Sequence, residues 1–508
     1  ILARRGVEAR VMHLNLFALE FLKASTYDGI SVVYALNDFL FSHTLDPVVT
    51  DAQRRHLRVK AEDLAFAGAL DPERVGAVDQ VIERMVEEIR ILKRLAVVPD
   101  TQNYVSYRNQ RAAGFPFNAR ELLWDMMHFI ARNAVGNGGE IAFATALGDM
   151  WQHQMSADVD AAHARRGHRS IVSPLLADHV APAPEQVLNI EIPAVRTAYE
   201  ILAGQLPFSV VPGNHDHDHM WADADYPPQP GAIDLHRLDL ASVGSIHCGS
   251  LENWTRNFGA QTPFFKNQPW YVSSFRQGAN SAQIFTGGTH RFLHLGLEMS
   301  PDGEVVDWAE SVLQAFPGVP TIVSIHEFLN PRGERQAAEC LDLSRLDPER
   351  HTPDRLWDSL ISRHDQILAV LNGHFHGVRH RVDPNQHGNQ VFQFLSDYQG
   401  RKQSLRGTFP DATVIDGIGD GWLRLMEFDL DAQRPRLRLR AYSTYFKAYA
   451  SDLPQYAAWY GHEHPEMSEA EFRALDDVEF DLVDFHTRFE RARVDGETAN
   501  ETQMAQRA

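Results

Sequence analysis

Between about residues 95 and 372, short apolar runs typical of strands take turns with stretches in which apolar residues recur at helical spacing. Short apolar runs typical of buried strands are LAVVP (95–99), IAFATAL (141–147), FSVVP (208–212), FLHLGLE (292–298), TIVSIH (321–326) and ILAVLN (367–372). Between them, apolar residues recur at helical spacing near 119–135, 190–204, 304–316 and 354–364. This alternation predicts an α/β fold with a buried sheet.

Further along the chain the pattern is different. Residues 391–398, 422–430 and 436–442 alternate between apolar and polar positions, as half-exposed strands do. Residues 154–188 and 213–290 are rich in Gly, Pro, Asn and His and are predicted to be long loops. Long loops in a compact domain are usually functional or mobile. No internal repeat is present.

The two ends of the chain read differently from the middle. Residues 1–94 are predicted to form a helical region of unknown role, because Asp71 and Pro72 begin a stretch of apolar residues at helical spacing. Residues 451–508 are acidic, and SEAE (468–471) is a capping box that predicts a last helix. The final dozen residues are expected to be disordered. The middle, 95–450, is predicted to be the functional domain.

Composition narrows the classes of function. The 508 residues include 48 Lys and Arg and 68 Asp and Glu, a formal charge of −20. An acidic surface repels phosphate backbones, so binding of long nucleic acid is not expected. No apolar run reaches about 18 residues, so no transmembrane segment is predicted. Cys248 and Cys340 allow one disulfide but form neither a disulfide framework nor a thiolate metal site.

The first residues do not settle the compartment. They start with basic residues, but Glu8 and Glu20 interrupt the stretch and no clear cleavage site follows. A secreted or periplasmic location therefore stays open, as does the oligomeric state.

Candidate chemistry gathers where the predicted strands end. Five strands are followed by polar side chains that can bind metal or transfer a proton: Asp100 and Gln102, Asp149, Asn214 and His215, His326, and His374 and His376. In open α/β sheets that edge is where ligands bind. Carboxylate, imidazole and amide ligands without sulfur suit Mn, Fe or Zn.

The number of these residues favours two metal ions. One catalytic zinc needs only three protein ligands. Two divalent ions about 3.5–4 Å apart, sharing a carboxylate, can activate water and hold both oxygens of an in-line displacement at phosphorus. The glycines before Asp149, Asn214 and His374 allow tight turns and close backbone approach.

The order D-x-[HQ], GD, GNH[DE], H and GHxH resembles that of the calcineurin-like metallophosphoesterases, from about Leu95 to about Tyr445. The resemblance implies a four-layer α/β/β/α sandwich, two divalent metal ions and a small-molecule phosphoester substrate, either a diester or a monoester. Gln102 stands where many members have His, and this DTQ variant is similar to what look like bacterial secreted members. The segments FLHLGLE, WAESVLQAFPGVPTIVSIHEFL and GDGWLRLMEFD are similar to those members as well.

The resemblance also implies roles for the individual residues. The first metal would be held by Asp100, Gln102, Asp149 and His376, and the second by Asp149, Asn214, His326 and His374. Asp149 would bridge the two. A metal-bridging hydroxide would attack phosphorus, and His215 would protonate or stabilise the leaving oxygen.

Neighbouring polar residues receive weaker interpretations. Asp216 is expected to orient its neighbours, and His217 and His219 to lie at the rim. GHEH (461–464) also fits GHxH, but it follows no apolar strand, so His462 and His464 are expected at the surface. Trp151 and the segment Asp397–Gln399 either line a substrate site or pack, and His153 either reaches the site or does not.

Two other functions remain open. The amide of Gln102 is a weaker, neutral ligand, so the domain is alternatively a non-catalytic module that binds a ligand or a partner. In a third interpretation, residues 1–94 dock a partner and the enzyme is cargo.

Overall fold

A computed structural model describes residues 93–494, except for 107–109, 111–117, 153–157, 172–183, 228–243, 405–416 and 431–433. The chain divides into two units between Leu92 and Lys93, and the second unit holds every described residue. The predicted helical region 1–94 lies outside the described residues, apart from Lys93 and Arg94, which begin a strand. The predicted disorder of the final dozen residues falls outside them too.

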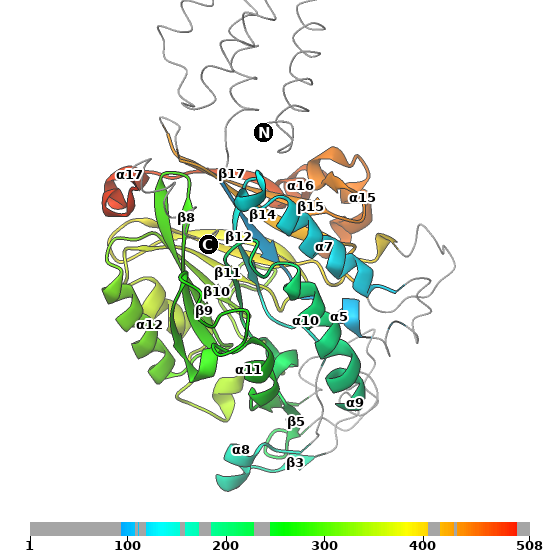
Figure 1. Cartoon of the computed structure of the whole chain (residues 1–508). Coiled ribbons are helices and arrows are strands. Elements are labelled where there is room, and N and C mark those ends of the chain that lie inside the picture. The colour runs from blue at the N-terminus through cyan, green and yellow to red at the C-terminus, as the bar shows by residue number, and fades with distance from the viewer. Residues whose placement is uncertain are drawn as a thin grey trace, which may run out of the picture. The chain divides into compact units, whose positions relative to one another are not determined.

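The described residues form a mixed α/β fold with two large mixed sheets (Figure 1). The first sheet has the order β16-β15-β14-β1-β2-β4, and β17 pairs with β15. Its strands are β1 Lys93–Val98, β2 Ile141–Ala146, β4 Phe208–Val210, β14 Trp422–Asp429, β15 Arg436–Ser443, β16 Ala448–Tyr449 and β17 Asp477–Asp481. β1, β2 and β4 are parallel, with Val98 opposite Ala146 and Ala146 opposite Val210. The loops that follow these three strands therefore leave the sheet at one edge.

The second sheet has the order β12-β13-β11-β10-β9-β8-β7. Its strands are β7 Tyr271–Phe275, β8 Asn280–Gly287, β9 His290–Leu297, β10 Thr321–Ile325, β11 Ile367–Asn372, β12 Gly377–Pro384 and β13 Gln390–Asp397. The four strands from β9 to β13 in this order are parallel. A small antiparallel sheet contains β3 Ser170–Ile171, β5 His219–Asp223 and β6 Ile246–Gly249.

Buried apolar side chains join these elements. One cluster joins β1 and β2 to the helices α7 Arg120–Arg132 and α10 Ile192–Glu200. A second joins β9, β10 and β11 to α12 Gly303–Ala315 and to the helical segment α13 Pro353–Leu356, which continues to Ile361. A third contains residues of both sheets, including the stacked rings of Phe143 and Phe285 with centroids 4.4 Å apart. In Figure 1, α12 lies on one side of the strands, and α7 and α10 on the other.

All nine predicted strands and all four helices of residues 95–450 overlap observed elements, so the α/β prediction is confirmed. The long loop predicted at 213–290 is wrong in large part. It contains β5, β6, α11 Glu252–Phe258, β7 and β8. In β8, polar residues occupy buried positions, so the sequence lacks the apolar pattern of a strand. Asn280 and Gln283 can be buried because their side chains donate hydrogen bonds to Glu298 and Ser281.

Two smaller elements also correct the sequence interpretation. The predicted loop 154–188 includes α8 Ala161–Arg165, which begins at the capping residue Asp160, and β3. The capping box of Ser468 and Glu471 is confirmed at the start of α16 Glu469–Leu475. That helix is not the last element, because β17 and α17 Phe485–Arg488 follow it.

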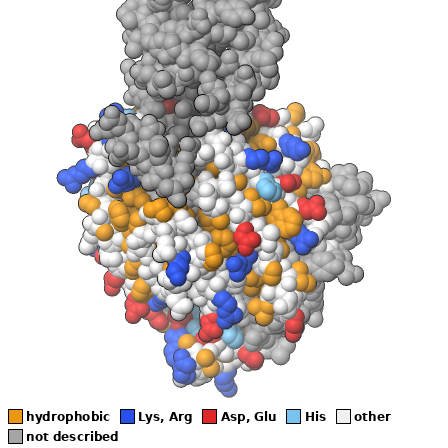
Figure 2. Space-filling view, in the orientation of Figure 1, with side chains coloured by type: hydrophobic (Ala, Val, Ile, Leu, Met, Phe, Trp, Pro, Cys, Tyr) orange, Lys and Arg blue, Asp and Glu red, His pale blue; other side chains and the backbone are white. Residues whose placement is uncertain are grey.

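Neither the visible surface charges nor the helices of the described residues mark a special surface or a membrane segment. Figure 2 shows acidic and basic side chains interspersed on the visible face, so the excess negative charge is not gathered in one patch there. Within the described ranges, no helix has the length and the apolar character that crossing a membrane requires.

Candidate metal centre

Four predicted ligands converge at the ends of strands from both large sheets. Asp149 follows β2, Asn214 opens a short turn after β4, His326 follows β10 and His374 follows β11. The Nε2 atom of His326 lies 3.0 Å from Asn214 Oδ1 and 3.2 Å from Asp149 Oδ2. It also lies 3.2 Å from His374 Nδ1. These four residues are the set predicted for the second metal.

The separations fit a bound cation. Ligand atoms about 2.0–2.1 Å from a tetrahedral metal ion lie roughly 3.3 Å from one another. The three measured separations of 3.0–3.2 Å are close to that value. Two imidazole nitrogens, a carboxylate oxygen and an amide oxygen are suitable donors for Mn, Fe or Zn.

The residues predicted for the first metal are less tightly gathered. Gln102 Nε2 donates to Asp149 Oδ2 at 3.3 Å, and Asp100 Oδ2 accepts from the backbone N–H of His374 at 3.1 Å. Among the described residues, nothing donates a hydrogen bond to the buried atoms Asp100 Oδ1, Gln102 Oε1 or Asp397 Oδ2. Buried acceptors without donors are costly, and a cation satisfies them.

His376 is arranged differently from the other predicted ligands. Its residue is exposed, and its Nε2 lies 2.8 Å from Gln399 Oε1. In the described part of the chain, no hydrogen bond or ion pair joins His376 to another predicted ligand. Hydrogen bonds therefore join Gln102 to Asp149 and Asp100 to His374, while His376 makes its own with Gln399. Burial lowers the pKa of His374 and of His215, and His376 still lies near enough for its charge to lower both further.

The electrostatics of the cluster favour positive charge at its middle. Burial raises the pKa of Asp100 well above its usual range, and the neighbouring carboxylates Asp397 and Asp149 raise it further. Burial opposes ionisation of Asp149 as well, but His215 and His326 hold its pKa far below the usual range. For His326, burial lowers the pKa, yet Asp149 and Asp100 raise it to about 10. A proton on His326 and a divalent cation would offset the same negative charge.

The backbone is strained where the ligands sit. Gly148 has φ 101°, and the non-glycine residues Asp149 and His374 have φ 50° and 70°. For the two non-glycine residues, such left-handed conformations cost about 1–3 kcal/mol each, and they cluster at functional sites. A Cβ atom on Gly373 would lie 2.1 Å from Asp100 Oδ1, so only glycine permits this close approach.

Polar contacts on the side away from the cluster orient the rings of His326 and His374. His326 Nδ1 lies 2.7 Å from the carbonyl oxygen of Leu147, so its N–H donates there and Nε2 faces the cluster. His374 Nε2 lies 3.4 Å from Glu327 Oε1, which leaves Nδ1 directed at His326. Partners of this kind fix the tautomer and raise ligand basicity.

His215 lies beside the cluster with a defined ring orientation. Its backbone N–H donates to Asp149 Oδ1 at 2.9 Å, and its Nδ1 lies 2.7 Å from Gln152 Oε1. The amide of Gln152 donates to Asn103, so its Oε1 acts as the acceptor. Burial lowers the pKa of His215 to about 4, and the neutral ring presents its Nε2 lone pair 3.7 Å from Asp149 Oδ2.

Gln152, Glu327 and Asp397 carry roles that the sequence interpretation missed or left open. Each follows a predicted ligand or a strand end within a few positions, which is the only signal the sequence offers. All three side chains are buried, so their hydrogen bonds and charges act on the candidate centre. The sequence does not reveal this burial, because it depends on how other segments pack against them.

The polar and aromatic residues next to the predicted ligands agree only in part with the sequence predictions. Asp216 orients its neighbours as expected, because its carboxylate accepts from Gly213 N at 2.8 Å and Met150 N at 2.9 Å. His217 is only 4% exposed and is not a rim residue. Trp151 packs against Trp254 and Phe258.

The second GHxH segment also needs a correction. His462 is exposed as expected, but His464 is buried. Its Nε2 lies 2.9 Å from the carbonyl oxygen of Val378 in β12. The surface expectation for His464 is therefore wrong, because the C-terminal segment folds back onto the second sheet.

The remaining open residues are settled in part. Tyr398 is buried and donates to Asp476 at 2.9 Å, so it packs. His153 lies outside the described residues. Cys248 and Cys340 are both free thiols.

Comparison with known proteins adds no family. No protein family matches the chain, and no curated protein matches it.

Proposed function

We propose that the chain is a dimetal-dependent phosphoester hydrolase of the calcineurin-like metallophosphoesterase class. The observation that carries the proposal is the convergence of Asp149, Asn214, His326 and His374 from four strand ends, with ligand separations that suit one cation. The buried acceptors of Asp100 and Gln102 next to Asp149 support a second cation.

The packing supports the matching fold. A four-layer α/β/β/α sandwich has two sheets that share a core and helices on both outer faces. One buried cluster here contains residues of both sheets, and separate clusters join each sheet to its own helices. In the proposed arrangement the strand ends of both sheets meet at the candidate metal centre.

Two bound divalent cations would supply an activated water and offset the negative charge on the phosphoryl group. The chain's own residues orient the reaction. Asp149 lies between the two predicted ligand sets, with Oδ2 toward His326 and Gln102 and Oδ1 held by His215 N. Gln152 holds His215 so that the Nε2 of the neutral ring faces the centre, where a proton taken up at Nε2 would pass to the leaving oxygen.

The proposed substrate class follows from the net charge of the chain. The net charge of −20 disfavours long polyanions, so a small phosphoester is the proposed substrate. Diester and monoester specificity are separated by assaying bis(p-nitrophenyl) phosphate and p-nitrophenyl phosphate with added Mn²⁺.

The test compares Asp149→Asn and His374→Ala with His462→Ala, a matched exposed histidine outside the centre. Near two metal ions bound at the candidate centre, besides any ion bound elsewhere in the chain, and hydrolysis are expected for the native protein and for His462→Ala. Both are expected to be lost or strongly reduced in the two centre variants. Unchanged hydrolysis in Asp149→Asn or His374→Ala would contradict the proposal.

One observation favours the second candidate, a non-catalytic binding module. His376 is directed at Gln399, and Gln102 supplies a neutral amide, so the first ligand set is the weaker one. One metal ion or fewer at the candidate centre, together with no turnover on either ester, would select this alternative.

A further inference from the structure

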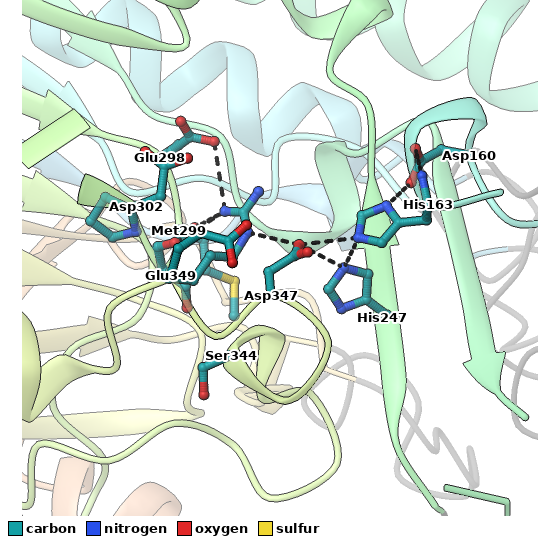
Figure 3. Close-up of polar contacts among 12 residues, drawn as sticks. Asp160, His163, His247, Glu298, Met299, Asp302, Ser344, Asp347 and Glu349 are labelled. Carbon is teal, nitrogen blue, oxygen red and sulfur yellow. Dashed lines mark hydrogen bonds and ion pairs between the residues drawn. The ribbon is translucent and has the colours of Figure 1, made fainter. Parts of the chain in front are cut away.

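A second group of histidines and carboxylates lies outside the candidate metal centre (Figure 3). His163 comes from α8, His247 from β6, and Asp347 from the loop after the short helix Leu343–Arg345. All three side chains are buried. Figure 3 shows both rings directed toward Asp347, with Asp160 behind His163. None of these residues belongs to the ligand sets of the proposed phosphoesterase centre.

Three donor atoms converge in this group. His163 Nε2 lies 2.9 Å from His247 Nε2 and 3.0 Å from Asp347 Oδ2. His247 Nε2 lies 3.5 Å from the same Asp347 oxygen. Donors around a tetrahedral zinc ion are separated by roughly 3.3 Å, so the triangle of atoms has the size that one ion requires.

The ring of His163 is oriented from behind. Its Nδ1 lies 2.5 Å from Asp160 Oδ2, while the other carboxylate oxygen of Asp160 accepts from Ala162 N and caps α8. The Nδ1 proton is therefore directed at Asp160, and Nε2 faces His247 and Asp347. A carboxylate behind a histidine ligand is the usual arrangement at protein metal sites.

The backbone is shaped to admit Asp160. A Cβ atom on Gly249, at the end of β6, would lie 2.0 Å from Asp160 Oδ2. Glycine at this position lets the carboxylate approach the strand that carries His247. The arrangement thus depends on a close contact as well as on the four polar side chains.

Two arginines balance the charge of Asp347, one at each carboxylate oxygen. Arg166 contacts Asp347 Oδ1 at 2.5 Å, which leaves Oδ2 for the histidines. Arg350 Nε lies 3.3 Å from Oδ2, but its NH1 is anchored separately on the carbonyl oxygen of Ser300 at 3.0 Å. An ion bound at Oδ2 would displace Arg350 Nε from that oxygen and would leave its contact with Ser300 in place.

We infer that His163, His247 and Asp347 form a third divalent-cation site, separate from the proposed catalytic centre. Two imidazoles and one carboxylate without sulfur suit Zn²⁺ among the common ions. His163 and Asp347 also line a cavity of about 850 Å³, so water from that cavity can supply the fourth ligand. The ion would join α8 and β6 to the loop that carries Asp347.

The test measures Zn²⁺ binding to the full chain, stripped with a chelator and reloaded. Metal content and calorimetric titration are compared for the native protein, His247→Ala, Asp347→Asn and His168→Ala. His168 is the matched control, because its ring lies 5.5 Å from that of His163 but contributes no donor to the triangle. The two site variants are expected to lose one equivalent of Zn²⁺, and His168→Ala none. Equal zinc content in all four proteins overturns the inference.

A second arm keeps the site intact and disables the other centre. The double variant Asp149→Asn/His326→Ala is expected to retain one equivalent, and Co²⁺ bound there should show the strong visible bands of a four-coordinate ion. Loss of all metal from this variant, with a native far-UV circular dichroism spectrum, overturns the inference. Because hydrolysis is not measured, failure of the proposed function does not affect this result.

Asp160→Asn separates a positioning role from a merely structural one. The substitution is expected to weaken Zn²⁺ affinity by about 10–100-fold while leaving the stoichiometry unchanged at high zinc concentration. Unchanged affinity would mean that Asp160 only caps α8, and that the triangle does not depend on it as proposed.

Discussion

Gly213 and Asp149 approach so closely that a Cβ atom on Gly213 would lie 2.1 Å from Asp149 Oδ1. The contact joins the turn after β4 to the turn after β2, and it sets where the predicted bridging carboxylate sits. Any side chain at position 213 must displace Asp149 or its own loop.

Gly213→Ala is therefore expected to reduce metal-dependent hydrolysis by about 100-fold, because displacements near 1 Å at a reaction centre have effects of this size. The matched control is Gly303→Ala at the start of α12, where an added methyl group meets no atom within 4 Å. Steady-state kinetics with Mn²⁺ and circular dichroism on both variants make the comparison. Native-like activity in Gly213→Ala would show that Asp149 is not needed at its present position.

Gln152 is expected to act on the proposed reaction through His215. Gln152→Ala removes the acceptor 2.7 Å from His215 Nδ1, so the ring loses its fixed orientation. We expect kcat to fall by about 10–100-fold, with metal content unchanged. Gln205→Ala, an exposed glutamine on the surface, is the control and should leave kcat unaltered. A fall in metal content instead of kcat would place Gln152 in metal retention.

Asp476 stabilises a buried group of two arginines and two tyrosines. Its carboxylate lies 2.5 Å from Arg424 and 3.4 Å from Arg401, and both arginines are fully buried. Asp476→Asn leaves Arg424 without its carboxylate partner, whereas Arg401 keeps Glu463 at 2.9 Å. Removing one member of a buried pair costs about 3–5 kcal/mol. Urea unfolding at neutral pH measures the loss. A change below about 1 kcal/mol would contradict this account.

The same carboxylate predicts a pH dependence. Burial opposes its ionisation, but Arg424 and Arg401 lower the pKa of Asp476 below its usual value. A lowered folded-state pKa stabilises the protein above the unfolded value of about 3.9, and the contribution is lost as pH falls through the folded-state pKa. The stability difference between native protein and Asp476→Asn should therefore shrink below about pH 4. A constant difference from pH 7 to the acid transition would argue against it.

The two histidines of GHEH should behave differently. His464→Ala leaves the carbonyl of Val378 without its donor in a buried position, which costs about 1–3 kcal/mol. His462→Ala changes an exposed side chain and is expected to stay within about 0.5 kcal/mol of the native protein. Chemical unfolding of both variants gives the comparison. Equal stabilities would mean that the contact with β12 contributes nothing net.

Apolar continuity in the sequence was sufficient to predict most of the parallel strands, but β13 is buried where alternation predicted a half-exposed strand. β1, β2, β4, β10 and β11 are buried on both faces, so each reads as an unbroken apolar run. β8 was not predictable in this way. Its buried Asn280 and Gln283 reach Glu298 and the β9 residue His294 only when β8 lies beside β9.

The candidate centre likewise contains residues that the sequence pattern identified and residues that it did not. Asp149, Asn214, His326 and His374 were identifiable because each directly follows a strand, and parallel strands deliver their ends to one edge. Gln152 and Glu327 carry no such mark, since a lone Gln or Glu after a motif is more often a surface residue. Their role depends on the rings that pack against them.

The sequence by itself determined the order of the strands and helices that carry the candidate centre and the positions of the polar residues at the strand ends, because periodicity and turn chemistry are local properties. Only the tertiary structure decided which of those residues meet. It directed His376 toward Gln399, buried His464 against β12, and gathered His163, His247 and Asp347 from three distant segments. Contacts between segments far apart in the chain depend on the packing of the whole domain, and no local pattern encodes them.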